Sequence, residues 1–371
     1  MKQIKFSKAN IFNEDLKLVK DVIKSGWLTH GKYTSLFENE IKKFTKAKYC
    51  LTVSSCTAGL HLSCLVAQFK KGDEVIVPSI THTATAHAVE YTGAKAVFAD
   101  VDVISGNLTL ENIKSKVSQN TKGVMLVHMA GVPCDLRNII KYCNKKKIKI
   151  IEDCAHSLGT LYQNKHVGTF GVSGSFSFYP TKQITTGEGG AIITNNREIY
   201  NKLKRLKAFG IDKDINDRKK VGDYDVKDLG FNYRMTDFQA ALGYNQIRKY
   251  SSNLKKRKNI AKKYIKNLSK NKNIKYMPFS ENFSYFVFQI FCKNRDKVLI
   301  ELKKNGIGVS VHYTNPLHKM SYYKNKYKIR NTDFLNSNNY SDTNISLPMY
   351  PALKNNEINY ICKKLNEIIY E

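Results

Sequence analysis

The stretch GSFSFYPTKQITTGEGGAIITNN, residues 174–196, indicates an apolar strand, a turn rich in glycine and threonine, and a second apolar strand. The turn holds a lysine, Lys182. Between two buried strands a lysine must lose its water or gain a partner, and desolvation lowers the pKa of an amine from about 10.4 toward neutrality. An uncharged amine attacks aldehydes, so Lys182 is a candidate Schiff-base former. The alternative is a solvated surface lysine, which is the commoner situation for such a loop taken alone.

A second stretch, KIIEDCAHSLGT at residues 149–160, places an acid where an apolar strand ends. Ligands of open α/β sheets bind at the carboxyl ends of the strands, so Asp153 is in a position to face a cofactor. A pyridine cofactor needs a carboxylate against its ring nitrogen to keep that nitrogen protonated. The alternative is that Asp153 caps a following helix, and without Lys182 the two interpretations carry equal weight.

A third stretch, LTVSSCTAGLHLS at residues 51–63, predicts a strand, a turn of small residues and a helix. Free N–H groups at the start of a helix bind anions, so Thr57 and Ala58 are candidates for holding a phosphate. Strand, turn and helix with small residues is a common arrangement, so this motif is weak by itself.

The order of apolar runs predicts a doubly wound α/β domain with a largely parallel sheet, followed by a smaller α+β domain. We expect strands at 49–53, 74–77, 96–99, 124–127, 148–151, 175–178 and 190–193, and helices at 13–25, 57–69 and 136–147. From about Ser251 the pattern changes to a Lys-rich helix, strands at 283–291 and 308–313, and helices at 295–305 and 356–369. The predicted domains are residues 1–250 and 251–371.

Composition narrows the class of protein. The 371 residues are 42% hydrophobic, the start MKQIKFSKANIF is unlike a signal peptide, and the chain contains no apolar run long enough to span a bilayer, so we expect a cytoplasmic protein without a membrane partner. Eight cysteines in a chain of this length do not suggest a disulfide scaffold, and their spacing is not that of a zinc site. We therefore expect reduced thiols and no metal.

The formal net charge of +30 raises nucleic acid as a partner. The charge is diffuse, however, because most of it is lysine scattered through predicted helices such as residues 255–272. A nucleic-acid interface would interleave basic and aromatic residues, and the sequence shows no such stripe. A solvated surface is the favoured interpretation, so we expect no nucleic-acid partner.

In this order the stretches resemble the fold-type I enzymes that use pyridoxal phosphate, PLP, and specifically the DegT/DnrJ/EryC1/StrS family of nucleotide-sugar aminotransferases. The resemblance covers essentially the whole chain. It is carried by SGWLTHGKYTSLFENE, SSCTAGLHL, GDEVIVPSITHTATAHAVEYTGA, VHMAGVPCDL, IEDCAHSLGT, SFSFYPTKQITTGEGG, LGFNYRMTDFQAALG, VHYTNPLH and SLPMYP. It implies a large PLP-binding α/β domain whose mostly parallel mixed sheet is sandwiched by helices, with an N-terminal substrate loop, and a smaller C-terminal α+β domain.

The resemblance also implies roles for residues at the cofactor. Lys182 matches the Schiff-base lysine and proton carrier, and Asp153 matches the partner of the pyridine nitrogen. Ser177 matches a phosphate ligand that acts beside Thr57 and Ala58.

Two histidines match positions around the cofactor ring. His156 stands where the family usually has Gln or His near the ring hydroxyl. His82 stands where relatives often place an aromatic residue on the ring face. The family glycine in the phosphate turn is Cys56 in this chain, which places a thiol near the cofactor.

Three further residues match more distant parts of the site. Asn232 matches a position that reaches the partner subunit's phosphate, which implies a homodimer with shared active sites; the alternative is an Asn in a turn before a helix. Tyr313 and His318 match the substrate side, and ordinary loop packing is the alternative for both.

The implied reaction transfers an amino group from an amino acid, in this family most often L-glutamate, to a nucleotide-diphosphate keto sugar by a ping-pong mechanism. The TTGEGG run resembles relatives that aminate C4 of a 4-keto-6-deoxy sugar. One competitor is the sugar dehydratase branch of the superfamily, which has histidine where this chain has Lys182. The other is a basic, nucleic-acid-associated protein without catalytic activity, suggested by the net charge alone.

Overall fold

The computed structural model describes residues 3–213, 220 and 222–370. Its large body is built on a seven-stranded sheet in the order β1-β9-β8-β5-β4-β2-β3. Strands β2, β3, β4, β5 and β8 are parallel to their neighbours among themselves, while β9 runs antiparallel to both β8 and β1. The predicted mostly parallel sheet is therefore confirmed. The strands are β1 (Tyr49–Val53), β2 (Glu74–Pro78), β3 (Lys95–Ala99), β4 (Thr121–Val127), β5 (Lys149–Asp153), β8 (Ser173–Ser177) and β9 (Gly190–Thr194).

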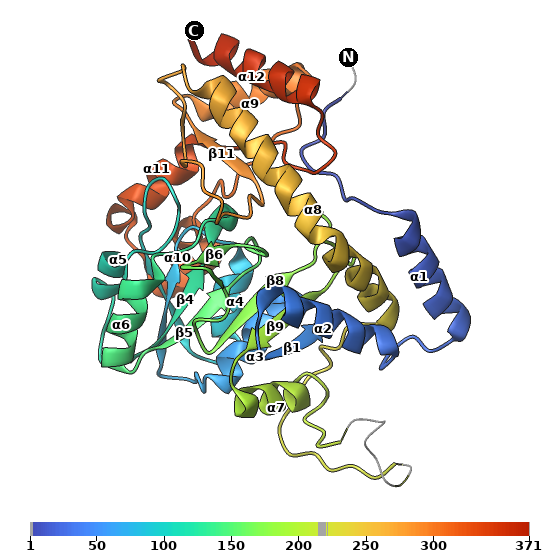
Figure 1. The fold of residues 1–371 in the computed structure, drawn as a ribbon. Coiled ribbons are helices and arrows are strands. Elements are labelled where there is room, and N and C mark those ends of the chain that lie inside the picture. The colour runs from blue at the N-terminus through green and yellow to red at the C-terminus, as the bar shows by residue number, and fades with distance from the viewer. Residues whose placement is uncertain (1–2, 214–219, 221, 371) are drawn as a thin grey trace.

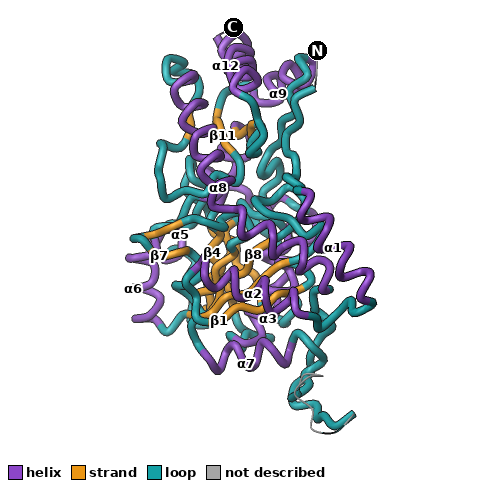
Figure 2. Tube along the Cα trace, turned by 45° about the vertical axis from the view of Figure 1, so that its right-hand side comes forward, coloured by secondary structure: helices purple, strands orange, loops and turns teal. Residues whose placement is uncertain are grey.

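Helices cover both faces of this sheet (Figures 1 and 2). The helices of the large body are α1 (Asn13–Ser25), α2 (Lys32–Thr45), α3 (Cys56–Val66), α4 (Thr83–Glu90), α5 (Leu110–Lys114), α6 (Leu136–Lys146) and α7 (Arg197–Leu206), with a 3-10 turn η1 (Met129–Gly131). Side chains alternate between the faces of a strand, and Val124 and Leu126 join the core under α2 and α6 while Met125 joins the core under α3 and α4. The strands are buried on both faces, which explains their continuous apolar runs.

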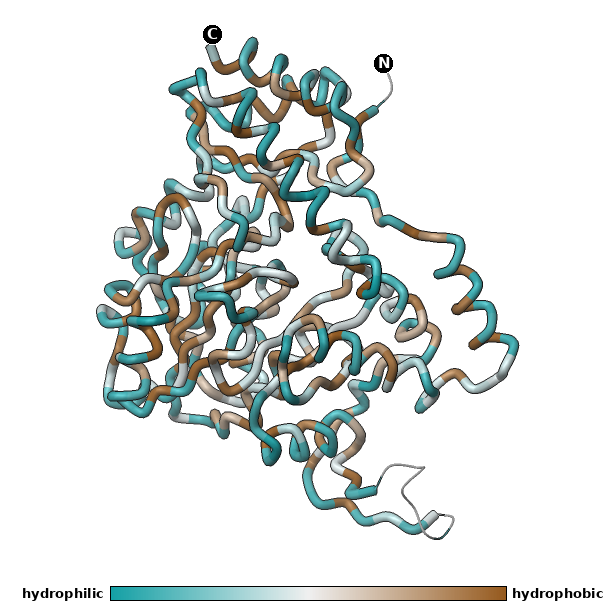
Figure 3. Tube along the Cα trace, viewed as in Figure 1, coloured by the Kyte–Doolittle hydropathy of each residue, from teal (hydrophilic) through white to brown (hydrophobic). Residues whose placement is uncertain are grey.

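The smaller body is a three-stranded antiparallel sheet covered by helices. Its strands, in the order β10-β11-β12, are β10 (Lys275–Tyr276), β11 (Phe288–Phe291) and β12 (Asn344–Leu347). Helices α9 (Arg295–Lys304) and α12 (Asn355–Tyr370) pack against this sheet, and α11 (Leu335–Thr343) contacts β11. The segments between α9 and α11, which are η3 (Leu317–Lys319), α10 (Ser321–Tyr327) and η4 (Asn331–Asp333), lie against the large body instead, because Leu317, Tyr323 and Phe334 join the core under α3 and α4. Hydrophobic residues concentrate inside both bodies, and the outer helix faces are hydrophilic (Figure 3).

Helix α8 (Asp237–Leu268) joins the two bodies (Figure 1). Its first half places Ile247 and Tyr250 in the core of the large body, and its second half places Tyr264 and Leu268 in the core of the small one. The predicted boundary at residue 250 therefore falls inside a continuous helix. The chain start also reaches the small body, because Ile4 forms a bridge with Ile307.

Two predicted strands were wrong in extent. The apolar stretch 283–291 forms a strand only over Phe288–Phe291. The stretch 308–313 forms no regular strand, because its backbone bonds go to two different partners: Gly308 donates to Ile4 and Ser310 exchanges bonds with Ser346. Two short elements lacked a sequence signal, strand β12 and the hairpin of β6 (Leu161–Tyr162) and β7 (Lys165–His166).

All eight cysteines are free and buried, as predicted for reduced thiols. Among the described residues, the structure contains no helix that combines the length and apolar character needed to cross a membrane.

Candidate active site

A cavity of about 470 Å³ lies at the carboxyl ends of β5 and β8. The starts of α3 and α4, the turn between β8 and β9, and two segments of the C-terminal part of the chain enclose it. This is the edge of an α/β sheet at which ligands bind. The cavity is lined by Ser55, Cys56, Thr57, Leu60, Thr81, His82, Ala84, Val127, Asp153, Ala155, His156, Ser177, Tyr179, Thr181, Lys182, Glu188, Phe286, His312 and Tyr313.

Lys182 enters this cavity from a turn that the backbone holds closed. Its own N–H donates to the carbonyl of Tyr179 at 2.9 Å, and the Nζ lies 4.3 Å from the ring centroid of Phe286. Burial lowers the pKa of the Lys182 ammonium to about 8. The sequence argument for a desolvated amine is consistent with this geometry.

The glycines after Lys182 allow the chain to return to the sheet. Gly189 has φ of 154°, and a side chain there would overlap Thr186. A Cβ on Gly190 would lie 2.7 Å from the backbone nitrogen of Cys56. Strand β9 therefore starts against the N-terminus of α3, which brings the lysine turn and the proposed phosphate turn together.

Asp153 is the last residue of β5 and is buried. Its carboxylate accepts hydrogen bonds from the Thr85 hydroxyl at 2.8 Å and from the Ala155 N–H at 3.0 Å. Residues 154–160 form turns, so the alternative of a helix cap is not met. The two donors orient the carboxylate at the cavity wall. Sequence inspection missed Thr85, which reaches Asp153 from α4.

The start of α3 and the end of β8 supply neutral polar groups. Thr57 and Ser177 line the cavity. Ala58 is not among the lining residues, and its N–H is already bound to the Ser55 hydroxyl at 3.1 Å. Burial, with the nearby Asp153 carboxylate, raises the pKa of the Cys56 thiol well above its usual value, so this thiol remains protonated.

The aromatic wall of the cavity contains two predicted histidines. His156 stacks on Phe286 with ring centroids 4.3 Å apart, and its Nε2 lies 3.3 Å from the Tyr313 hydroxyl. Burial and then the Lys182 charge hold the pKa of His156 well below its usual value, so the ring is neutral. His82 caps α4 by accepting the Ala84 N–H at its Nδ1, 3.2 Å away. Phe286 was missed because its apolar stretch predicts only a strand.

Two predicted residues lie away from this cavity. The exposed Asn232 forms a backbone bridge with Ala208. The buried His318 stacks on Phe334 at 4.0 Å and bonds Asn331 through its Nε2. His312, beside Tyr313, lines the cavity instead, and the VHYTNPLH motif was the only signal for it.

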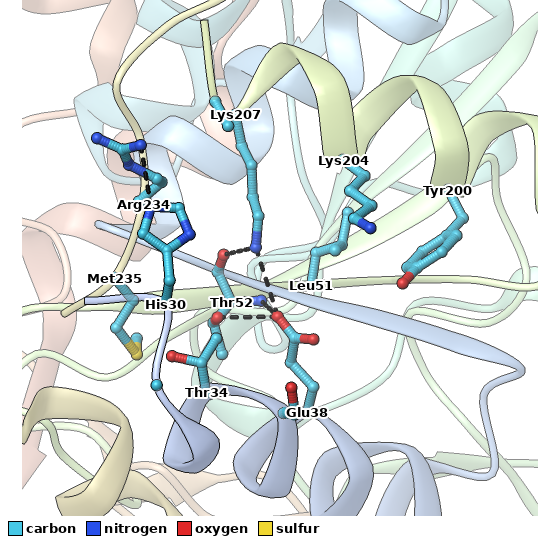
Figure 4. Close-up of a pocket in the computed structure, with 13 residues that line it drawn as sticks. His30, Thr34, Glu38, Leu51, Thr52, Tyr200, Lys204, Lys207, Arg234 and Met235 are labelled. Atoms are coloured by element: carbon cyan, nitrogen blue, oxygen red, sulfur yellow. Dashed lines mark hydrogen bonds and ion pairs between the residues drawn. The ribbon is translucent and has the colours of Figure 1, made fainter. Parts of the chain in front are cut away.

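A second polar cavity of about 200 Å³ adjoins α2 and α7 (Figure 4). Glu38 accepts the Thr52 N–H at 2.8 Å and the Thr52 hydroxyl at 2.9 Å, while Lys207 donates to the Thr52 carbonyl at 3.1 Å (Figure 4). These groups tie α2 and the end of α7 to β1. Neither Lys182 nor Asp153 lines this second cavity.

The family model for the DegT/DnrJ/EryC1/StrS aminotransferase family matches residues 9–366. GDP-perosamine synthase of Escherichia coli O157:H7 is 32% identical to this chain, and the alignment covers 99% of each of the two chains.

Two solved structures share the fold over nearly their full lengths. PseC of Helicobacter pylori, an aminotransferase involved in the biosynthesis of pseudoaminic acid, superposes with a TM-score of 0.92 at 28% identity, covering 100% of both chains. Spr1654 of Streptococcus pneumoniae, assigned as a sugar aminotransferase and solved in a PMP form, superposes with a TM-score of 0.93 at 27% identity, covering 99% of both chains.

Proposed function

The chain belongs to the DegT/DnrJ/EryC1/StrS aminotransferase family, and from this premise we propose that it transfers the amino group of L-glutamate to a nucleotide-linked 4-keto-6-deoxy sugar. The family is PLP-dependent, and its solved members include sugar aminotransferases in PLP and PMP forms. The observation that carries the proposal is the shared cavity of Lys182 and Asp153.

The residues that line this cavity fit PLP. Lys182 would hold the aldehyde carbon, Asp153 would face the pyridine nitrogen, and Thr57 with Ser177 would hold the phosphate at the start of α3. When bound, the cofactor supplies an electron sink for the bond that breaks at the α-carbon of the amino acid.

Lys182 is suited to carry the proton. With a pKa of about 8, its Nζ is uncharged in an appreciable fraction of molecules near neutral pH. An uncharged Nζ can accept the proton released from the amino-acid α-carbon and return it on the other side of the exchange. The Thr85 hydroxyl and the Ala155 N–H would orient Asp153 toward the ring nitrogen. The dehydratase alternative is disfavoured because that branch has histidine in place of this lysine.

The choice of acceptor is supported by the relatives. One is a GDP-perosamine synthase, and another is an aminotransferase involved in the biosynthesis of pseudoaminic acid. The TTGEGG run favours amination at C4, as argued from the sequence.

A homodimer with shared sites is part of the same proposal. It is supported by the apolar side chains that one chain leaves exposed, such as Leu229 at 89% and Trp27 at 54% exposure. These residues lie on the loop after α7 and next to the projecting α1 (Figure 1). The exposed Asn232 follows Leu229 closely in the sequence, and a partner subunit packed on this loop would bring Asn232 toward its own cavity.

The test is a half-reaction screen. The enzyme is loaded with pyridoxamine phosphate and mixed with keto sugars linked to UDP, dTDP, GDP or CMP, and recovery of the visible absorbance of bound PLP is followed. One or more 4-keto-6-deoxy sugars should restore the absorbance, and L-glutamate should discharge it. Lys182→Ala should abolish both changes, while Lys303→Ala, on the exposed end of α9, should not. An enzyme that responds to no keto sugar contradicts the proposal.

A further inference from the structure

The small body contains a cavity of about 520 Å³ that shares none of its described lining residues with the Lys182 cavity. Its walls come from the loop after β3, the segment between α8 and the start of β10, the ends of β11 and α12, the start of α9, and α11. The lining residues are Val103, Ile104, Lys272, Asn273, Lys275, Phe291, Cys292, Lys293, Asn294, Lys297, Val298, Asn339, Thr343, Ile368 and Ile369. Its volume is in the range of sites that hold small organic ligands.

Every charged residue among the described lining residues is a lysine. The four are Lys272, Lys275, Lys293 and Lys297. None of them forms an ion pair with a residue in the described part of the chain, and the nearby Asp296 is paired with Arg295 at 2.6 Å. Four exposed cations around one hollow repel one another and attract an anion.

The helix that borders this hollow adds to the same field. Helix α9 begins at the cavity, and its N-cap residue Asn294, at φ of 52°, makes no side-chain cap bond. The first-turn N–H groups of such a helix carry a partial positive charge. An anionic group placed at the start of α9 would therefore lie near this N-terminus and near Lys293 and Lys297.

The floor of the cavity is apolar. Phe291 and Val298 are buried, and Ile104, Ile368 and Ile369 are partly exposed toward it. An inorganic anion would leave this surface in contact with water, whereas a ligand with an apolar body would cover it. We propose that this cavity binds a small organic anion with an aryl or alkyl body and a single phosphate, sulfonate or carboxylate group.

The experiment titrates the PLP-loaded enzyme with 8-anilinonaphthalene-1-sulfonate and follows its fluorescence. The holoenzyme is used so that the cofactor occupies the Lys182 cavity. The double variant Lys293→Gln/Lys297→Gln should raise the Kd at least about fivefold, because two charges near the sulfonate are lost. Lys303→Gln, on the same helix but away from the cavity, should leave the Kd within about twofold.

A second ligand separates charge recognition from general stickiness. The uncharged analogue N-phenyl-1-naphthylamine should bind the wild-type enzyme more weakly, and its Kd should not change with added KCl. The sulfonate should bind more weakly as KCl rises. The proposal is overturned if the wild-type enzyme does not bind the sulfonate, if the double variant binds it as the wild type does, or if Lys303→Gln weakens binding equally.

Discussion

Lys182 differs from an ordinary lysine in its protonation, because burial lowers its pKa to about 8 from the usual 10.5. At pH 7 about one amine in ten is then uncharged, compared with about one in three thousand for a solvated lysine. We expect the rate at which the apoenzyme takes up PLP to rise about tenfold per pH unit below pH 8 and to level off above it. Stopped-flow absorbance measures this rate.

The cofactor itself titrates, so the same PLP solutions are mixed with a free lysine derivative as a control. Dividing the two profiles removes the cofactor's contribution. A ratio that shows no inflection near pH 8 would contradict the assigned pKa of Lys182.

Thr85 positions the Asp153 carboxylate with a 2.8 Å hydrogen bond. Thr85→Val keeps the shape of the side chain and removes the donor. Because a hydrogen bond to a charged group contributes about 1.5–3 kcal/mol, we expect PLP to bind roughly 10- to 100-fold more weakly. Equilibrium titration of the apoenzyme with PLP measures this change. Thr85→Ser keeps the hydroxyl and should bind PLP nearly as the wild type does; equal losses in both variants would argue against the role.

The residues that carry the chemistry of the site could be predicted from the sequence, whereas the residues that contact them could not. Asp153 ends strand β5 and Lys182 lies in the turn between β8 and β9, so both could be placed from the periodicity of the strands beside them. Thr85 and Phe286 could not be found in this way, because each reaches the cavity from an element whose placement depends on long-range packing. His318 was predicted near the substrate, yet its Nε2 bonds Asn331 and its ring stacks on Phe334 in its own segment.

Among the elements, α2 has no N-terminal cap of its own, because the residue before it is Gly31. The Asp237 carboxylate at the start of α8 replaces that cap by accepting the Thr34 N–H at 2.8 Å and the Thr34 hydroxyl at 3.0 Å. A side chain at position 31 would overlap this carboxylate. Asp237→Ala should therefore lower the melting temperature by roughly 1–2 °C, as expected for the loss of a cap worth about 1 kcal/mol in a chain of this length.

Differential scanning calorimetry measures this change, with Glu198→Ala as the matched control. Glu198 is also an acid in a first helical turn, but it is exposed. The control corrects for the lost interaction with the helix dipole. If both variants melt at the same temperature, Asp237 does not act as a cap for α2.

The predicted strands of the large sheet agree with the structure to within three residues at each end, because strands buried on both faces carry a strong apolar signal. The small body was harder to predict. Strand β12 reads Asn-Ile-Ser-Leu, and its pairing with β11 depends on residues more than 50 positions away. The helix α8 was split at residue 250 because its two halves pack in different cores, which changes the composition without ending the helix.

At the scale of the whole molecule, the Lys182 cavity and the cavity beside α9 lie in different electrostatic environments. The Lys182 cavity combines a cation with a buried carboxylate, whereas the cavity beside α9 has cations alone among its described lining residues. The lysines that give the net charge of +30 therefore have different roles in different parts of the surface. Where lysines gather around an apolar floor, the charge has a specific ligand to attract, and elsewhere it solvates the surface.

The proposed homodimer predicts that two inactive variants restore each other. Lys182→Ala removes the amine of its own cavity, and Asn232→Asp would place a negative charge against the phosphate in the partner subunit's cavity. In a hybrid dimer the cavity that keeps Lys182 receives Asn232 from the Lys182→Ala subunit, so one of two sites is intact. Co-expression in equal amounts makes about half of the dimers hybrid, and about a quarter of all sites should be active.

The measurement is the specific activity of co-expressed, differently tagged subunits, compared with each variant expressed alone. Purification through both tags in turn isolates the hybrid dimers, which should show about half of the wild-type activity per subunit. Tagged wild-type subunits carried through the same steps control for losses in handling. If isolated hybrids are as inactive as the parents, Asn232 acts within its own chain, because only a contact across the interface allows two defective subunits to complete one site.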